Sequence, residues 1–230
     1  MLTLTVSPNV NPGTVSGNTS LCVGSMDTYT SNGDPGGTWM STNTMVATVD
    51  AMTGVVTAVA SGTTDIRYSF SAGCGSPVFS FLTLSVAPTT VLNTNDTGAG
   101  SLRDIVSCAG DGAMISFDAS LTGQTILLTS GELIINKNLT FTGLGALNLA
   151  ISGNGNSRVF HLQPGKTLTI TNMKLKDGSS MIDGGAALVD GYLILQDVIF
   201  ENNLENGIPK SLTVTPAATV EILGNVDLKN

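Results

Sequence analysis

The chain has 230 residues, of which 11% are charged and 5% aromatic, and a formal net charge of −8 with a pI near 4.3. This acidity argues against nucleic acid or an anionic membrane as the partner, because both repel negative charge. No run of eighteen apolar residues occurs, so we expect no membrane-spanning helix in this segment, and no signal peptide is recognisable. Few charges and 27 glycines are typical of β-rich extracellular architecture rather than of a helical enzyme.

Residues 1–87 are expected to form a separate unit, since Arg67 is their only basic residue against four acids. Short runs of alternating apolar and polar residues are separated, at intervals of about ten, by turns rich in Gly, Asn, Asp and Pro. This spacing predicts a β-sandwich. We expect its strands near residues 20–23, 26–31, 37–41, 45–49, 55–60, 64–70 and 78–86.

The stretch from Gly37 to Ile66 closely resembles the bacterial immunoglobulin-like domain of group 2. The resemblance implies that Trp39 is the core tryptophan of the sandwich and not a platform for stacking a sugar. Residues 2–8 (Leu-Thr-Leu-Thr-Val-Ser-Pro) echo residues 82–88 (Leu-Thr-Leu-Ser-Val-Ala-Pro), the last strand of the unit. We therefore expect residues 2–8 to be the tail of a preceding domain of the same kind, and the chain to be part of a longer, modular one.

A short helix is predicted near residues 102–109. Ser101, followed three residues later by Asp104, approximates a capping box with Asp in place of the usual Glu. Four apolar residues after Ser101 share one helical face: Leu102, Ile105, Val106 and Ala109. Such a helix would lie across the open first coil of a stacked-repeat core and cover its edge.

The last third of the chain repeats a strand pattern, in which two alternating apolar residues, an Asn or Asp, and two more alternating apolar residues follow each other. The central residues Asn172, Asp197 and Asn225 are 25 and 28 residues apart, which is a repeat period rather than a hairpin spacing. Asn and Asp tolerate the left-handed conformation of a sharp corner. We therefore expect the three to stack at one corner of successive coils of a parallel β-helix over residues 88–230.

A second marker keeps nearly the same period, since Leu162, Leu188 and Val214 are 26 residues apart each time. Segments 122–128 and 149–160, with the predicted helix, resemble the start of right-handed parallel β-helices in bacterial surface proteins. These are proteins of the polymorphic outer-membrane-protein type and other pectate-lyase-like folds, and the resemblance covers roughly residues 90–205. It implies a right-handed β-helix with an N-terminal cap. Because the last strand ends without a cap, we expect further coils to follow in the native protein.

The candidates for catalysis or metal binding are few. His161 is the only histidine, and alternation with Phe160 and Leu162 predicts that it faces outward. A β-helix lyase would need calcium-binding acids on adjacent coils and a basic residue. Weak candidates are Asp177, Asp183 and Asp190, with Asp197, Glu201, Lys174 and Lys176 nearby. The alternative is that these residues keep the turns and edges of the coils soluble, so no cofactor is expected and calcium is left open.

Two cysteines, Cys22 and Cys74, lie in the predicted sandwich, and an extracellular domain of this size favours a disulfide between them. They stand near opposite ends of an ideal sandwich, which argues against the bond. Cys108 is expected to be a small buried apolar residue beneath the capping helix.

Three functions remain open. The first is a non-enzymatic adhesin of the bacterial surface or exterior that presents glycan- or protein-binding surfaces, and it is favoured because no catalytic cluster is visible. The second is a polysaccharide lyase or hydrolase with acids aligned on adjacent coils. The third is a structural stalk. Exposed aromatic residues would favour binding, but Tyr192 is the only Tyr or Trp beyond residue 87.

Overall fold

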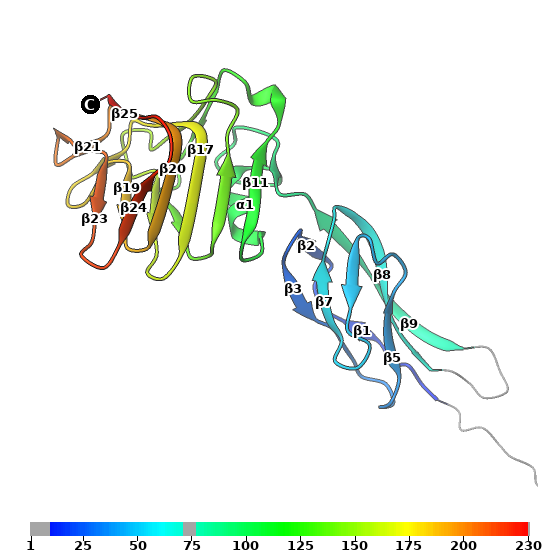
Figure 1. The fold of residues 1–230 in the computed structure, drawn as a ribbon. Coiled ribbons are helices and arrows are strands. Elements are labelled where there is room, and N and C mark those ends of the chain that lie inside the picture. The colour runs from blue at the N-terminus through cyan, green and yellow to red at the C-terminus, as the bar shows by residue number, and fades with distance from the viewer. Residues whose placement is uncertain (1–9, 71–76, 230) are drawn as a thin grey trace, which may run out of the picture. The chain divides into compact units, whose positions relative to one another are not determined.

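The computed structural model describes residues 10–70 and 77–229. The chain divides into two compact units, residues 1–88 and 89–230, so the division lies one residue after the predicted boundary. Both units are built from strands, with one short α-helix in the second (Figure 1). The predicted fold class is confirmed: an all-β chain with an immunoglobulin-like unit followed by a β-solenoid. Residues 2–8 lie outside the described residues.

The described residues of the first unit form nine strands. A four-stranded sheet has the order β2-β9-β8-β5, a three-stranded sheet has the order β3-β7-β6, and β1 pairs with β4. The strands are β1 (Val15–Ser16), β2 (Ser20–Cys22), β3 (Met26–Thr28), β4 (Thr30–Ser31), β5 (Thr38–Ser41), β6 (Ala47–Val49), β7 (Val55–Ala58), β8 (Gly62–Phe70) and β9 (Val78–Ala87). Only β1 has no counterpart among the sequence-based strands, because two residues are too short to show a period.

Trp39 lies in the core of this unit. Its side chain is 7% exposed, and its ring centroid is 4.8 Å from that of Tyr68 on the neighbouring strand β8. Gly54 follows the turn after β6 with a φ of +73°, and a Cβ there would lie 2.4 Å from the carbonyl oxygen of Tyr29 and 3.0 Å from the indole of Trp39. Glycine is therefore required at residue 54 both for conformation and for space.

The second unit is a parallel β-solenoid of about five turns. Its strands are β10 (Thr90–Val91), β11 (Ala113–Phe117), β12 (Gln124–Leu127), β13 (Leu133–Ile135), β14 (Leu139–Thr142), β15 (Leu149–Ser152), β16 (Phe160–Leu162), β17 (Thr167–Lys176), β18 (Ser179–Ser180), β19 (Ala187–Val189), β20 (Tyr192–Glu201), β21 (Leu204–Glu205), β22 (Ile208–Pro209), β23 (Leu212–Val214), β24 (Thr219–Ile222) and β25 (Val226–Lys229). A 3₁₀ turn covers Ala119–Leu121.

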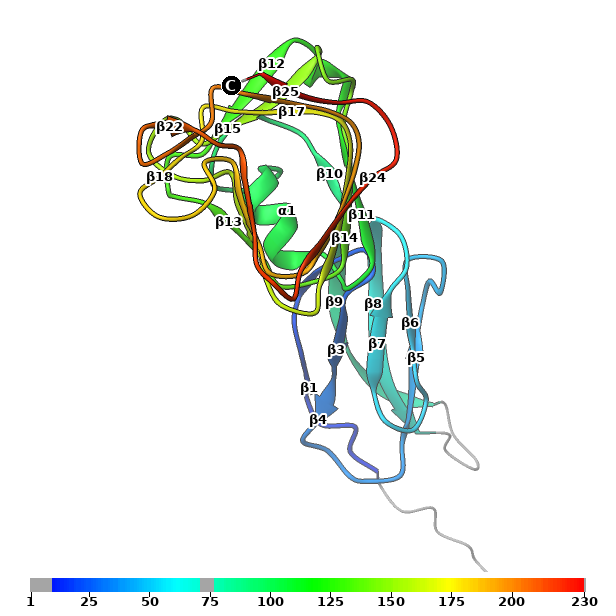
Figure 2. The ribbon, with the colours of Figure 1, turned by 60° about the vertical axis from the view of Figure 1, so that its left-hand side comes forward.

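Each coil contributes to three faces. The first face contains β10, β11, β14, the first half of β17, the first half of β20, and β24. The second face contains β12, β15, the second halves of β17 and β20, and β25. The third face contains β13, β16, β19 and β23. All of these pairs are parallel, and the coils are visible end-on in Figure 2.

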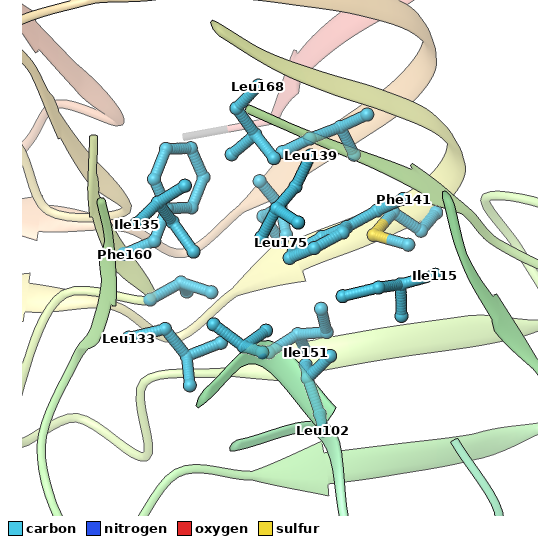
Figure 3. Close-up of a cluster of buried hydrophobic side chains, with 14 of the residues drawn as sticks. Leu102, Ile115, Leu133, Ile135, Leu139, Phe141, Ile151, Phe160, Leu168 and Leu175 are labelled. Carbon is cyan, nitrogen blue, oxygen red and sulfur yellow. The ribbon is translucent and has the colours of Figure 1, made fainter. Parts of the chain in front are cut away.

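The core of the solenoid is a ladder of apolar side chains that point inward from every coil. On the first face Leu139, Leu168 and Leu193 are aligned by strand register, and none of the three is more than 3% exposed. Figure 3 shows Leu139 and Leu168 in this interior together with Leu102 of the helix. Because fully burying such a side chain stabilises a protein by about 1.5–3 kcal/mol, the stacked coils supply most of the stability of the unit.

At the corner between the first and second faces, two coils carry the expected Asn or Asp in the left-handed conformation. Asn172 and Asp197 have φ values of +56° and +54°, and the register of β17 with β20 places them side by side. Asn225 does not adopt this conformation, because Leu223 and Gly224 lengthen the turn by one residue. Its backbone N–H instead donates to Oδ1 of Asp197 at 3.1 Å, which supplies the amide donor that this carboxylate needs.

The second repeat marker, Leu162, Leu188 and Val214, was wrong at Leu188. Leu162 pairs with Val189, which pairs in turn with Val214, so Leu188 does not belong to that column. Leu188 is aligned with His161 and faces outward with it. The even spacing of 26 misled because it averages two unequal coils of 27 and 25 residues.

The helix α1 (Leu102–Cys108) closes one end of the apolar ladder. Leu102, Ile105 and Val106 are buried and belong to the solenoid core, and α1 lies within the outline of the coils in Figure 2. Oγ of Ser101 accepts a hydrogen bond from the N–H of Asp104 at 3.2 Å. The N–H of Ser101 donates to the carbonyl of Gly98, so the reciprocal half of the capping box is not formed.

Asn203 joins two coils from inside the solenoid. It is fully buried; its Oδ1 accepts from the N–H of Gly178 at 2.9 Å, and its Nδ2 donates to the carbonyl of Leu175 at 3.1 Å. Both partners lie one coil away. The side chain therefore satisfies two main-chain groups that the corner would otherwise leave unpaired.

We predict that Asn203→Ala lowers the free energy of unfolding of the solenoid by about 2 kcal/mol, because two buried main-chain groups lose their partners. Differential scanning calorimetry measures the effect. The control is Asn156→Ala, an exposed asparagine in the same unit, which should change stability by less than about 0.5 kcal/mol. Equal effects from the two variants would contradict the role of Asn203.

Candidate functional site: a polar groove on the solenoid

A polar groove of about 580 Å³ opens where the chain turns from the second face to the third. Its walls come from one turn in each of three coils: residues 131–132, residues 155–158 and residues 179–181. These turns lie side by side because the strands that flank them are paired in register, β12 with β15 and β13 with β16 and β19. Turns separated by about 25 residues in sequence therefore form one surface.

Arg158 forms the floor of this groove. Its Nε lies 2.5 Å from Oε2 of Glu132 on the preceding coil, and its Nη1 donates to Oγ of Ser180 at 3.2 Å and to the carbonyl of Asp183 at 2.8 Å. The side chains of Arg158 and Glu132 are 15% and 22% exposed. The guanidinium thus joins three coils, and its charge is neutralised by the carboxylate.

Two polar side chains of the groove have no hydrogen-bond partner among the described residues. Asn156 is exposed, and its amide makes no hydrogen bond within the described part of the chain. The hydroxyl of Ser179 is likewise without a partner among the described residues, although its backbone N–H donates to the carbonyl of Ser157. An amide and a hydroxyl next to a neutral ion pair suit a ligand with hydroxyl or amide groups better than a charged one.

A second ion pair fixes the first wall of the groove. Arg103 on α1 bonds Asp96 through Nε at 3.0 Å and Nη2 at 2.8 Å, and it also donates to the carbonyls of Gly131 and Glu132. Burial raises the pKa of Asp96, but hydrogen bonds from Ser130 and Arg103 outweigh burial and lower the pKa to about 2. Helix and turn are therefore held together by a carboxylate that stays ionised over most of the pH range.

The sequence-derived acids do not converge on one point. Asp177 contacts Lys176 at 3.3 Å at the end of β17, and Asp183 offers its carbonyl to Arg158. Asp190 lies 2.6 Å from Nε2 of His161 on the third face. The hydrogen bond from His161 lowers the pKa of Asp190 against the effect of burial. Within residues 10–70 and 77–229, no three His, Cys, Asp or Glu side chains form a group that could hold a metal ion.

The side chains of Lys174 and Lys176, which were considered for a lyase, face outward as their sequence pattern predicts. Each of them contacts a carboxylate. Nζ of Lys174 lies 2.8 Å from Oε2 of Glu201 on the next coil, and Nζ of Lys176 lies 3.3 Å from Oδ2 of Asp177. His161 also faces outward, and its partner Asp190 is a coil neighbour that the sequence did not associate with it. The contacts of Lys174 and His161 join neighbouring coils, whereas the contact of Lys176 lies within one coil.

Sequence reasoning missed Arg158 and Glu132 because it searched adjacent coils for groups of acids near Lys174 and Lys176, and not for pairs of opposite charges elsewhere. A usable signal existed, since the two residues are 26 apart, which is one coil period. Lys174 and Glu201 are 27 apart in the same way. Opposite charges at the repeat spacing, rather than clusters, indicate contacts in a solenoid.

The cysteines differ from expectation. Cys22 and Cys108 are both disulfide-bonded, and Cys108 is half-buried, whereas a small buried apolar residue was expected there. Cys74 lies outside the described residues, and its predicted pairing with Cys22 is not described by the structure.

Comparison with known proteins identifies the first unit. An immunoglobulin-like sandwich in series with a parallel solenoid is the architecture of a modular protein. The family model of the bacterial Ig-like domain (group 2) matches residues 3–69, so the chain carries such a domain. Domains of this family are non-catalytic and occur in surface or extracellular proteins. No curated protein matched the chain. No helix among the described residues is long and apolar enough to cross a membrane.

We predict that replacing Asp96 with Asn destabilises the solenoid by about 1–2 kcal/mol at pH 7. The folded-state pKa of Asp96, about 2, lies below the unfolded value of about 3.9, so its contribution is present above pH 4 and is lost as the pH falls toward 2. Urea unfolding between pH 2 and pH 7 measures the difference. The control is Asp183→Asn, because the carboxylate of Asp183 makes no hydrogen bond or ion pair in the described chain. A loss of stability on Asp96→Asn that is the same at pH 2 and pH 7 would contradict the prediction.

We also predict that Cys22 and Cys108 react with iodoacetamide in the unfolded protein only after reduction, because disulfide sulfurs are not nucleophilic thiolates. Peptide mass mapping before and after reduction reads out each cysteine separately. Labelling of Cys108 without reduction would contradict the structure.

Proposed function

We propose that the chain belongs to an adhesive protein of the bacterial surface or exterior, and that the groove around Arg158 binds an uncharged glycan. The groove is the observation that carries the proposal. It runs over three coils, holds unpartnered hydrogen-bonding groups at Asn156 and Ser179, and has no net charge at its floor. Glycan hydroxyls donate and accept hydrogen bonds, as these groups do.

The solenoid suits adhesion for a second reason. Parallel coils place equivalent turns about 4.8 Å apart, so a chain-like ligand can contact several turns at once. Each contact is weak, and their sum becomes useful when many are made together or when the module is repeated. A protein of this kind needs rigid spacing, which the buried ladder and the ion pairs between coils supply.

A polysaccharide lyase is the alternative that this proposal sets aside. Acid–base cleavage requires two ionisable groups held near the bond with separated pKa values. Here Lys174 and Lys176 each face a carboxylate at 2.8 Å and 3.3 Å, and Asp190 faces His161 on another face. No described contact favours turnover, so we do not advance this function.

A glycan array probed with the 230-residue chain tests the proposal, and we predict binding to neutral glycans. Asn156→Ala should weaken that binding about three- to tenfold, because one hydrogen bond is lost. The matched control Asn136→Ala changes an exposed asparagine outside this groove and should bind as the unchanged chain does. Equal losses in both variants would remove the groove from the proposal.

Two outcomes would contradict the proposed adhesive function. If no glycan is bound, the remaining function is that of a spacer. If incubation with acidic polysaccharides and calcium releases unsaturated product, the lyase is correct. Absorbance of the unsaturated product distinguishes the second outcome from binding without turnover.

A further inference from the structure

The groove around Arg158 has an exposed apolar side chain among its polar ones. Met181 lines the groove beside Ser179 and Ser180, and its side chain is 77% exposed. The next residue, Ile182, is 76% exposed, so two adjacent apolar side chains face water at this turn. Contact with an apolar group of a ligand would remove part of that surface from water, which favours binding.

The turn that carries Met181 is held in place without a ligand. Oγ of Ser180 accepts a hydrogen bond from Nη1 of Arg158 at 3.2 Å. The same oxygen accepts from the N–H groups of Ile182 and Asp183 at 3.4 Å and 3.3 Å, so it closes the turn around Met181. Binding therefore does not have to order the main chain of this turn.

The amide of Asn156 lies on the neighbouring turn. The N–H of Ser179 donates to the carbonyl of Ser157 at 3.0 Å, which places residues 155–158 beside residues 179–181. The side chains of Asn156 and Ser179 have no hydrogen-bond partner among the described residues. The groove thus combines an open amide, an open hydroxyl and an exposed methionine on two adjacent coils.

The charges of the groove restrict the ligand. Arg158 and Glu132 are the two charged side chains among the described residues that line it, and Nε of Arg158 lies 2.5 Å from Oε2 of Glu132. Each charge already has its partner, so neither favours a carboxylate or an ammonium group on the ligand. Plain hydroxyls would use Asn156 and Ser179 but would leave Met181 in water. An acetamido group suits the amide and the methionine together, because it has an N–H donor, a carbonyl acceptor and a methyl group.

We propose, building on the glycan-binding function above, that the groove recognises glycans with N-acetyl groups, such as chains of N-acetylglucosamine. The amide of Asn156 donates to the acetamido carbonyl and accepts from the acetamido N–H, and the acetamido methyl packs on Met181. The hydroxyl of Ser179 bonds a ring hydroxyl of the same sugar. A sugar without the N-acetyl group is disfavoured, because it leaves the methionine in water and the amide incompletely paired.

Three matched trimers of the same linkage test the proposal. They consist of N-acetylglucosamine, glucose or glucosamine, and they differ only in the acetamido, hydroxyl or ammonium group beside the anomeric carbon. Titration of the 230-residue chain, followed in ¹H–¹⁵N spectra, gives a dissociation constant for each trimer even where binding is weak. We expect the N-acetylglucosamine trimer to bind about tenfold more tightly than either of the other two.

Failure of the N-acetyl preference is distinguishable from failure of glycan binding. Equal binding of the glucose and N-acetylglucosamine trimers overturns the preference and leaves glycan binding in place. Tightest binding of the glucosamine trimer, or of a capped alanine tripeptide that has amides but no sugar, also overturns the preference. Binding of none of the trimers overturns both the preference and the proposed function.

Met181→Ser tests the apolar contact. This variant should lower the preference for the N-acetylglucosamine trimer over the glucose trimer about three- to tenfold, because the acetamido methyl loses its contact. The matched control is Met114→Ser, since Met114 is 62% exposed on β11 and does not line the groove. Both methionines are exposed, so neither change opens a cavity in the core. Equal preferences in the two variants overturn the proposed contact.

Discussion

Parallel pairing of each coil with the next is the constraint on which the second unit depends. A single coil cannot bury its inward side chains, because it is one strand thick, so Leu168 becomes fully buried only when Leu139 and Leu193 lie above and below it. The helix α1 covers this column at one end with Leu102, Ile105 and Val106. Every other feature of the solenoid, including the groove, follows from the register that this burial imposes.

Register also decides which polar groups meet. A residue has its coil neighbours about 25 to 29 positions away, and some ion pairs of the solenoid follow this rule, as Glu132 with Arg158 and Lys174 with Glu201 show. Lys137 extends it to the cap, since its Nζ donates to the carbonyls of Ser107 and Ala109 at 2.7 Å, at the negative end of the helix dipole. Charged residues therefore tie neighbouring coils together.

The two units differ in the side chains that fill their cores and in those that line their surface hollows. In the sandwich, aromatic side chains fill the core between two sheets, and Met52 is exposed at the hollow that Trp39 also lines. In the solenoid, apolar side chains fill the core and the turns carry the amide of Asn156 and the hydroxyl of Ser179. The groove of the solenoid is the surface to which we assign a hydroxyl-bearing ligand.

The sequence by itself determined the two architectures, because both follow from local sequence patterns. Strand alternation at Leu168 and Ile170 and the helix start at Ser101 depend on residues close in sequence, and the repeat of Asn172 and Asp197 is the recurrence of one such local pattern. The structure shows each feature. The tertiary structure alone decided the coil lengths, which moved the third-face column from Leu188 to Val189, and the contacts of Arg158 and Asn203. Those contacts join residues a full coil apart, and an error of one residue in coil length reverses which side chains face inward.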